Sequence, residues 1–172
     1  MTRAMAVCLL ALAGAGAGCL RPKPAVTALP APPEPVLAVD HMDLQASPVA
    51  SNWDNRPGPD GLVVRVFFYR IDPKTGQTGT VTVSGSLQFL LYEGKVSPQE
   101  ASAAQPFQVW AFLPEQLPVF LGRSLGLWGY QMQLAWADHV PRSDSVTLVA
   151  RYQPPEGPPM FSMPANIAMG LK

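Results

Sequence analysis

The chain has 172 residues, and 48% of them are apolar, which fits one domain with a core of ordinary size and excludes wholesale disorder. Lys and Arg number 12 and Asp and Glu number 12, so the sequence lacks the basic stripe that binding to nucleic acid requires. Its 20 prolines and 14 glycines argue against a helical protein and favour short strands joined by turns.

Residues 1–18 have the features of a secretory signal peptide. Arg3 supplies a positive charge, and residues 4–17 are small or apolar, a run shorter than the about 20 residues of a membrane span. Gly16-Ala17-Gly18-Cys19 resembles the lipobox of bacterial lipoproteins. The resemblance implies cleavage between Gly18 and Cys19, followed by acylation of the cysteine sulfur and of the new amine. Cleavage by an ordinary peptidase near Ala17, giving a secreted protein, is the alternative hypothesis.

The cysteine content supports the lipid hypothesis. Cys8 would leave with the signal peptide, so Cys19 would be the only cysteine of the mature chain. Acyl chains there, at about 0.8 kcal/mol per buried methylene, would anchor the protein permanently in a bilayer. The lipobox resemblance also favours the outer membrane, because Leu20 stands where inner-membrane lipoproteins usually carry Asp.

A tether is predicted at residues 19–38. Its segment RPKPAVTALPAPPEP, residues 21–35, has six prolines and favours an extended polyproline II conformation. We expect a disordered but semi-rigid spacer that lifts a domain at residues 39–172 off the membrane.

That domain has the pattern of an all-β protein. Strands are expected at 42–47, 62–69, 80–92, 107–112, 127–136, 145–152 and 161–169, with helix confined to one turn at 114–120. Residues 62–69 are apolar on both faces, as in a central strand, whereas 80–92 alternate. Gly85 indicates a bulge or bend at which a long strand turns across a sandwich. The pattern predicts an antiparallel β-sandwich of about 7–8 strands.

Four segments resemble a known family: WDNRPGPDGLVVRVFFYR, VSGSLQFLLYEG, FLPEQLPVFLGRSLGLWGYQMQLAW and SVTLVARYQPPEGPPMFS. They are similar to a family of small bacterial lipoproteins with a C2-like β-sandwich domain. The similarity covers nearly the whole domain. It implies a C2-like fold and a place in the cell envelope, and it implies no activity.

One motif suggests catalysis. Residues 122–126, GRSLG, match the G-x-S-x-G nucleophile elbow, which would make Ser124 the nucleophile of a serine hydrolase or esterase. An elbow needs a strand before it and a helix after it, but prolines precede Ser124 and a strand pattern follows. His139 is the only later histidine, and its neighbour Asp138 is poorly placed to orient it. We therefore favour a turn whose glycines supply positive φ, with the hydrolase as the alternative.

Calcium binding is a further alternative. Candidate oxygen ligands are Asp54, Asp60, Asp138 and Asp144, because an up-and-down strand count puts the loops 51–60, 93–100 and 138–144 at one end of the sandwich. Each aspartate stands singly beside turn residues, so turn capping is the simpler interpretation. Phospholipid binding through exposed apolar loop tips, without metal, is the other C2-type alternative.

The remaining candidate residues favour a structural interpretation. The four tryptophans at 53, 110, 128 and 136 fit core positions better than a platform for sugars or peptides. We expect no cofactor besides the covalent lipid on Cys19. The sequence thus predicts a membrane-anchored envelope lipoprotein with a non-catalytic binding or structural domain, whose partner is an envelope protein or polymer.

Overall fold

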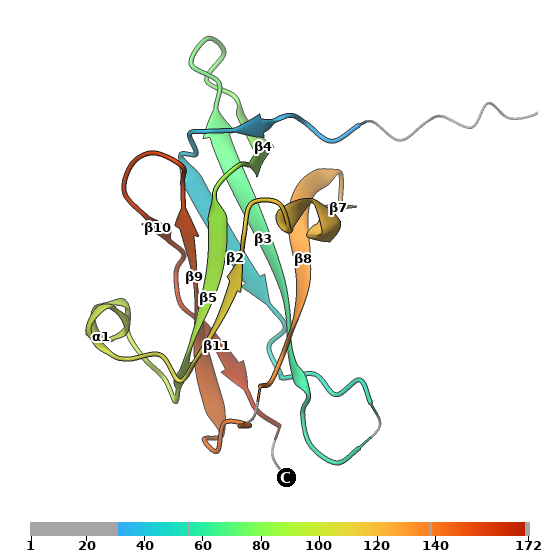
Figure 1. Cartoon of the computed structure of the whole chain (residues 1–172), viewed down its shortest axis with the longest axis vertical. Coiled ribbons are helices and arrows are strands. Elements are labelled where there is room, and N and C mark those ends of the chain that lie inside the picture. Colours follow the sequence, from blue (N-terminus) through green and yellow to red (C-terminus); the bar gives the residue numbers. More distant parts are fainter. Residues whose placement is uncertain (1–30, 55, 138, 171–172) are drawn as a thin grey trace, which may run out of the picture. The chain divides into compact units, whose positions relative to one another are not determined.

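Two β-sheets pack face to face in the computed structural model, which describes residues 31–170 except Asn55 and Asp138 (Figure 1). This all-β sandwich confirms the predicted fold class. The first sheet holds β1 (Pro35–Val36), β2 (His41–Ala46), β3 (Gly61–Ile71), β4 (Thr78–Val83), β7 (Leu121–Ser124) and β8 (Leu127–Ala135). The second holds β5 (Ser86–Glu93), β6 (Gln108–Phe112), β9 (Ser145–Gln153), β10 (Met160–Phe161) and β11 (Ala165–Ala168).

The central strand of the first sheet is β3, as its apolar residues on both faces predict. β2 pairs along one of its edges, while β8 and β4 follow each other along the other edge, at residues 61–66 and 68–71 of β3. β7 extends the sheet beyond β8. β1 pairs in parallel with β4, whereas the other strand pairs of this sheet are antiparallel.

In the second sheet, β9 is central. β5 pairs with it along its whole length, and β6 lies beyond β5. β11 and β10 share the other edge of β9. The single strand expected at 161–169 is divided into these two because Pro164, between them, cannot donate a backbone hydrogen bond.

The chain passes from one sheet to the other at Gly85. The strand expected at 80–92 divides there into β4 and β5, which belong to different sheets, so the predicted bend is confirmed. A Cβ atom on Gly85 would lie 2.1 Å from the carbonyl oxygen of Gln153 and 2.7 Å from the ring of Tyr152. Only glycine fits this close approach of two backbones.

Two core tyrosines hold the crossing. The hydroxyl of Tyr130, in the first sheet, accepts a hydrogen bond from the amide of Val83 at 3.0 Å, and the hydroxyl of Tyr152, in the second, accepts one from Gly85 at 3.2 Å. Phe68 packs against both rings, with centroids 5.8 and 4.9 Å away. Burial raises the pKa of both tyrosines. The core and the change of sheet are therefore fixed by the same side chains.

Helical structure departs from the prediction. The 3-10 helix η1 (Leu117–Phe120) lies within the expected turn at 114–120, but the helix α1 (Pro98–Ala103) lies outside it, so the prediction that helix is confined there is wrong. The signal is a capping box with a proline at the first helical position. The Ser97 side chain accepts from the Glu100 amide at 3.3 Å, and the Glu100 carboxylate accepts from the Ser97 amide at 2.8 Å.

The sandwich also includes residues ahead of the expected boundary at 39. β1 lies within the segment predicted as tether, and the Thr82 hydroxyl donates to the carbonyl of Pro33 at 2.8 Å. The predicted signal peptide and the predicted tether up to Pro30 are outside the described residues. Within residues 31–170, neither helix is long and apolar enough to cross a membrane.

Candidate functional site

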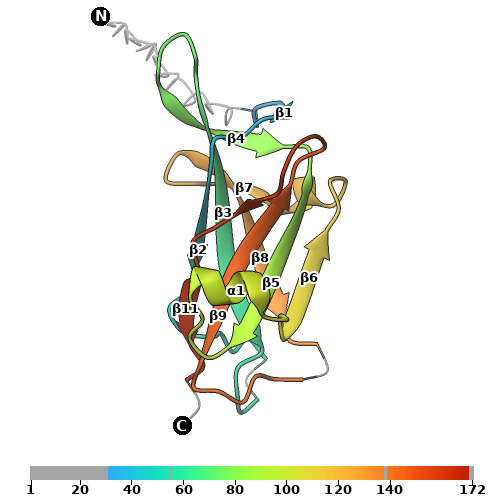
Figure 2. The same cartoon turned by 90° about the vertical axis from the view of Figure 1, so that its left-hand side faces the viewer.

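A pocket of about 510 Å³ lies between α1 and the outward face of the second sheet. Figure 2 shows α1 lying across the strands β5 and β9. The floor comes from Leu90 and Tyr92 of β5 and from Val149 and Arg151 of β9, and α1 contributes Pro98 among others. The pocket volume is in the range of about 300–1,000 Å³ that is usual for small-molecule sites.

Three sets of hydrogen bonds position the helix over the sheet. The capping box orders its first turn. Ahead of it, the buried Thr147 hydroxyl donates to the carbonyl of Gly94 at 2.8 Å and accepts from the amide of Val96 at 3.0 Å. Within it, the Tyr92 hydroxyl donates to the carbonyl of Ala101 at 2.9 Å. No residue of α1 is buried, so the helix covers the sheet without filling the space beneath it.

The outward residues of β5 and β9 explain why a helix covers this face of the sheet. Along β9, Val146, Leu148, Ala150 and Tyr152 point into the core, so Val149 points outward, and yet it is only 4% exposed. Tyr92, outward on β5, is also 4% exposed. The stretch Leu148-Val149-Ala150, apolar on both faces, was the sequence signal for a strand covered on both sides.

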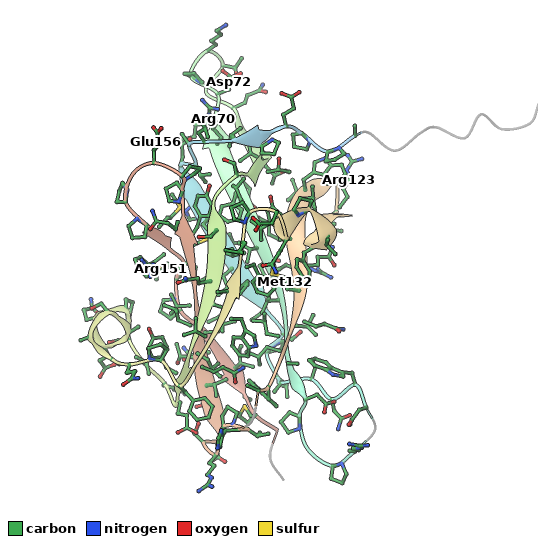
Figure 3. The ribbon with its side chains drawn as sticks, viewed as in Figure 1. Arg70, Asp72, Arg123, Met132, Arg151 and Glu156 are labelled. Atoms are coloured by element: carbon green, nitrogen blue, oxygen red, sulfur yellow. The ribbon has the colours of Figure 1, made fainter. Side chains whose placement is uncertain are left out.

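Arg151 is the one charged residue that lines the pocket. Figure 3 shows its side chain on the outer side of the second sheet. Nη1 donates to Oε1 of Gln88 at 3.4 Å, a long hydrogen bond, and the guanidinium carbon lies 5.8 Å from the centroid of the Phe161 ring. Nε is buried and has no hydrogen-bond partner among the described residues. Among all the described residues, the only ion pair joins Arg56 and Asp54. No carboxylate there neutralises Arg151.

The polar side chains that line the pocket are those of Tyr92, Ser102, Arg151 and Ser162. Its two serine hydroxyls donate to backbone carbonyls, Ser102 to Gln99 at 2.6 Å and Ser162 to Met163 at 3.0 Å. No histidine or carboxylate is among its lining residues to act as a general base. An apolar wall and one cation with unused donors can hold a ligand and orient it.

Ser124 lies elsewhere, in a β-hairpin. It ends β7 and pairs with Leu127, the first residue of β8, so Leu125 and Gly126 form a two-residue turn with φ of 51° and 85°. Both values are positive, as a type I′ turn requires. The interpretation that both glycines of GRSLG supply positive φ needs correction. Gly122 lies within β7, and Leu125 takes the conformation instead.

The hairpin also separates Ser124 from the histidines. Ser124 lies beside Leu127 at the start of β8, and His139 follows the end of β8. The eight residue steps between Leu127 and Ala135 span about 26 Å. His41 is on β2, across β3 and β8 from β7. The strand before the turn is antiparallel to the strand after it, and no helix follows Ser124 in the described residues up to 170.

The candidate calcium ligands do not form a cluster in the described residues. The Asp60 carboxylate accepts from the amides of Trp53 and Asp54 at 2.6 and 3.1 Å, and the Asp54 carboxylate accepts from the Arg56 amide at 2.8 Å. Both carboxylates thus cap their own loop, which lies at the same end of the sandwich as the start of β9, the strand that Asp144 precedes (Figure 1). Asp138 is outside the described residues. Elsewhere in residues 31–170, no group of three or more potential metal ligands comes together.

The tryptophans occupy partly buried and rim positions. Trp110 and Trp136 pack against the core with ring centroids 6.2 Å apart, and each indole donates to a backbone carbonyl at 2.8 Å. Trp53 is 39% exposed and its ring covers Gly61, where a Cβ would approach it to 2.7 Å. No tryptophan lines the pocket under α1.

The pocket was missed at the level of sequence, and the predicted acylation site, Gly18 and Cys19, is outside the described residues. The chain was compared with protein-family models, with curated proteins and with solved structures, and none of them matches it.

Proposed function

We propose that the protein is a membrane-anchored lipoprotein of the cell envelope whose β-sandwich binds a ligand and catalyses no reaction. The anchor is a lipid on Cys19, in the lipobox-like segment Gly16-Ala17-Gly18-Cys19. Leu20 favours the outer membrane. The C2-like character of the sandwich is part of this proposal.

The pocket under α1 is the observation that carries the binding role. A six-residue helix with no buried side chain adds little to the core, and yet a capping box, Thr147 and Tyr92 hold it in place. Its position encloses a space with apolar walls and a cation that lacks a carboxylate partner. Such a space is typical of ligand sites.

The anchor is tested by fractionation and mass. Cys19→Ser should move the protein from the membrane fraction to the soluble fraction, and the intact mass of the wild-type chain should include acyl groups. Cys8→Ser is the matched control, because Cys8 lies in the segment that is removed. Membrane retention of the Cys19→Ser protein, or an unmodified Cys19, would refute the anchor.

The pocket is tested by native mass spectrometry of the protein isolated from its own membranes. We expect a non-covalent adduct on the wild-type chain. Ala101→Phe, which fills the pocket from the helix side, should remove the adduct. Ala103→Phe, on the same helix but outside the lining, should retain it. Equal adducts on both variants, or none on the wild type, would contradict a binding role for this pocket.

A further inference from the structure

We infer that the pocket under α1 takes an amphipathic carboxylate, that is, a ligand with an apolar body that ends in one carboxylate group. The inference rests on the proposed binding role of the pocket and adds the chemical class of the ligand. Three features of the pocket carry it: the unused donors of Arg151, the single charge among the lining residues and the apolar walls.

The guanidinium of Arg151 is prepared for an oxyanion. It has five N–H donors, and its neighbours are an amide oxygen of Gln88 at 3.4 Å and the face of Phe161, both uncharged. The Nε atom is buried and has no acceptor among the described residues, so a ligand would use the N–H groups of the two Nη atoms, of which Gln88 takes one. A carboxylate matches the planar fork of the guanidinium with two parallel hydrogen bonds.

The charge of the site sets the charge of the ligand. Arg151 is the only charged residue among those that line the pocket. One cation neutralises one carboxylate, whereas a phosphate monoester would bring an excess negative charge into apolar surroundings, at a cost in desolvation. A carboxylate is therefore favoured over a phosphate.

The rest of the lining accommodates an apolar body. Leu90 and Val149 form the floor beside Arg151, α1 contributes Pro98 and Ala101, and Pro106 also lines the pocket. Tyr92 is tied to the helix through its hydroxyl, so it presents its ring rather than a polar group. Burial of hydrocarbon against these side chains contributes about 25 cal/mol per Å² of apolar surface.

Calorimetric titration with defined probes tests this class. The protein is the full chain with Cys19→Ser, which cannot be acylated, so the result does not depend on the lipid anchor. Decanoate is expected to bind at least about tenfold more tightly than 1-decanol, which has the chain without the charge, and acetate, which has the charge without the chain, should not bind measurably. Equal affinity for decanoate and 1-decanol, or tighter binding of decyl phosphate than of decanoate, would overturn the inference.

Two variants assign the effect to Arg151. Arg151→Gln should weaken decanoate binding by about tenfold or more and leave 1-decanol within about twofold. Arg65→Gln is the matched control, because Arg65 is an exposed arginine on a strand of the other sheet. An unchanged affinity of the Arg151→Gln protein for decanoate would refute the assignment. The probe series on the unsubstituted pocket tests the ligand class even where Arg151→Gln fails to fold.

The two proposals fail in different ways. A non-covalent adduct that Ala101→Phe removes, together with no binding of decanoate, would leave the binding role in place and refute the carboxylate. The absence of both would refute the pocket as a ligand site. Release of the Cys19→Ser protein from membranes reports on the anchor alone.

Discussion

The outward faces of the two sheets present different surfaces to their surroundings. On the first sheet, Arg65 of β3 and Gln131 and Gln133 of β8 point outward and are exposed, as expected for a solvated face. On the second sheet, Val149 and Tyr92 point outward and are nearly buried beneath α1. Both sheets have the same inward alternation of apolar residues, so the core pattern does not distinguish them. The outward residues distinguish them, because only the second sheet has nearly buried outward residues beneath a helix.

Each face covers its apolar residues by a different means. The first sheet has one large outward ring that is buried, Phe67, which is 4% exposed and lies directly over Gly129. The ring is accommodated within the sheet because the neighbouring strand has no side chain there. The second sheet uses a separate helix, which stands off and leaves a pocket. A self-covered face needs no ligand, whereas a face covered at a distance has room for one.

A charge placed on each face should give the largest difference in stability between the two sheets. Val149→Lys buries an ammonium group without a partner, and we expect it to lower the free energy of unfolding by about 3 kcal/mol or more. Lysine is chosen because Arg151 could neutralise an acid at this position. Gln133→Lys, at an exposed position of the other sheet, should change stability by less than about 0.5 kcal/mol. Urea denaturation measures both, and similar losses would contradict the difference between the faces.

The self-covered face can be tested at two glycines that pair with each other across β7 and β8. A Cβ atom on Gly129 would lie 2.7 Å from the Phe67 ring and 3.0 Å from the carbonyl oxygen of Val66, so Gly129→Ala should cost about 1–3 kcal/mol. At Gly122, the nearest atom would be the end of the flexible Gln131 side chain at 3.1 Å.

Gly122→Ala is therefore the control and should cost little, because Gln131 can move into solvent. Thermal unfolding followed by circular dichroism compares the two variants. If Gly129→Ala were as stable as Gly122→Ala, the Phe67 ring would not be packed on the glycine.

The cover of the second sheet depends on one hydroxyl. Tyr92→Phe removes the hydrogen bond to the carbonyl of Ala101 and should lower stability by about 1 kcal/mol. Hydrogen exchange should show faster exchange of the α1 amides and little change in β9. Tyr69→Phe, at a half-buried tyrosine on the outward face of β3, is the matched control and should leave α1 unaffected.

The pH dependence of stability gives a second test of the Tyr92 hydrogen bond. Burial raises the pKa of Tyr92, so the folded state keeps the phenol neutral where the unfolded chain would begin to ionise it, near pH 10.0. The unfolded state then holds fewer protons, and stability falls as pH rises above that value. Because an ionised oxygen cannot donate to Ala101, the advantage of wild type over Tyr92→Phe should shrink above pH 10.0. An advantage that stays constant there would show that the hydroxyl does not hold the helix.

Much of the fold could be predicted from the sequence, because a buried face imposes a period of two on a strand. That period located most strands, and Gly85 located the change of sheet. The strand count, 11 in the described residues against about 7–8 predicted, differs where pattern carries less information. β1 has two residues, β7 has four, and Pro164 divides the last predicted strand. Strands this short show no period.

The pocket could not be predicted in the same way. It depends on how α1 lies over the sheet, and that position follows from hydrogen bonds of Thr147 with residues just before α1 and of Tyr92 with Ala101 within it. Two signals were present in the sequence: the capping box from Ser97 to Glu100 and the doubly apolar stretch around Val149. Neither signal identifies Arg151, whose significance comes from the carboxylate that its surroundings lack.

The smallest expected effect concerns the turn that resembled a catalytic motif. Leu125 has a φ of 51° and is 99% exposed, so it bears a left-handed conformation that suits Gly or Asn and gains no burial in return. Leu125→Asn would give Asn-Gly, the preferred pair for this turn, and should raise the free energy of unfolding by about 0.5–1 kcal/mol. Leu127→Asn, two residues later in β8, is the control and should lower stability, because Leu127 is 41% exposed and partly packed in a strand. Chemical denaturation of both variants decides the matter. A lower free energy of unfolding for Leu125→Asn would mean that the leucine makes a stabilising contact that outweighs its backbone strain. A higher one would show that this hairpin of the first sheet holds backbone strain, on the other sheet from the pocket.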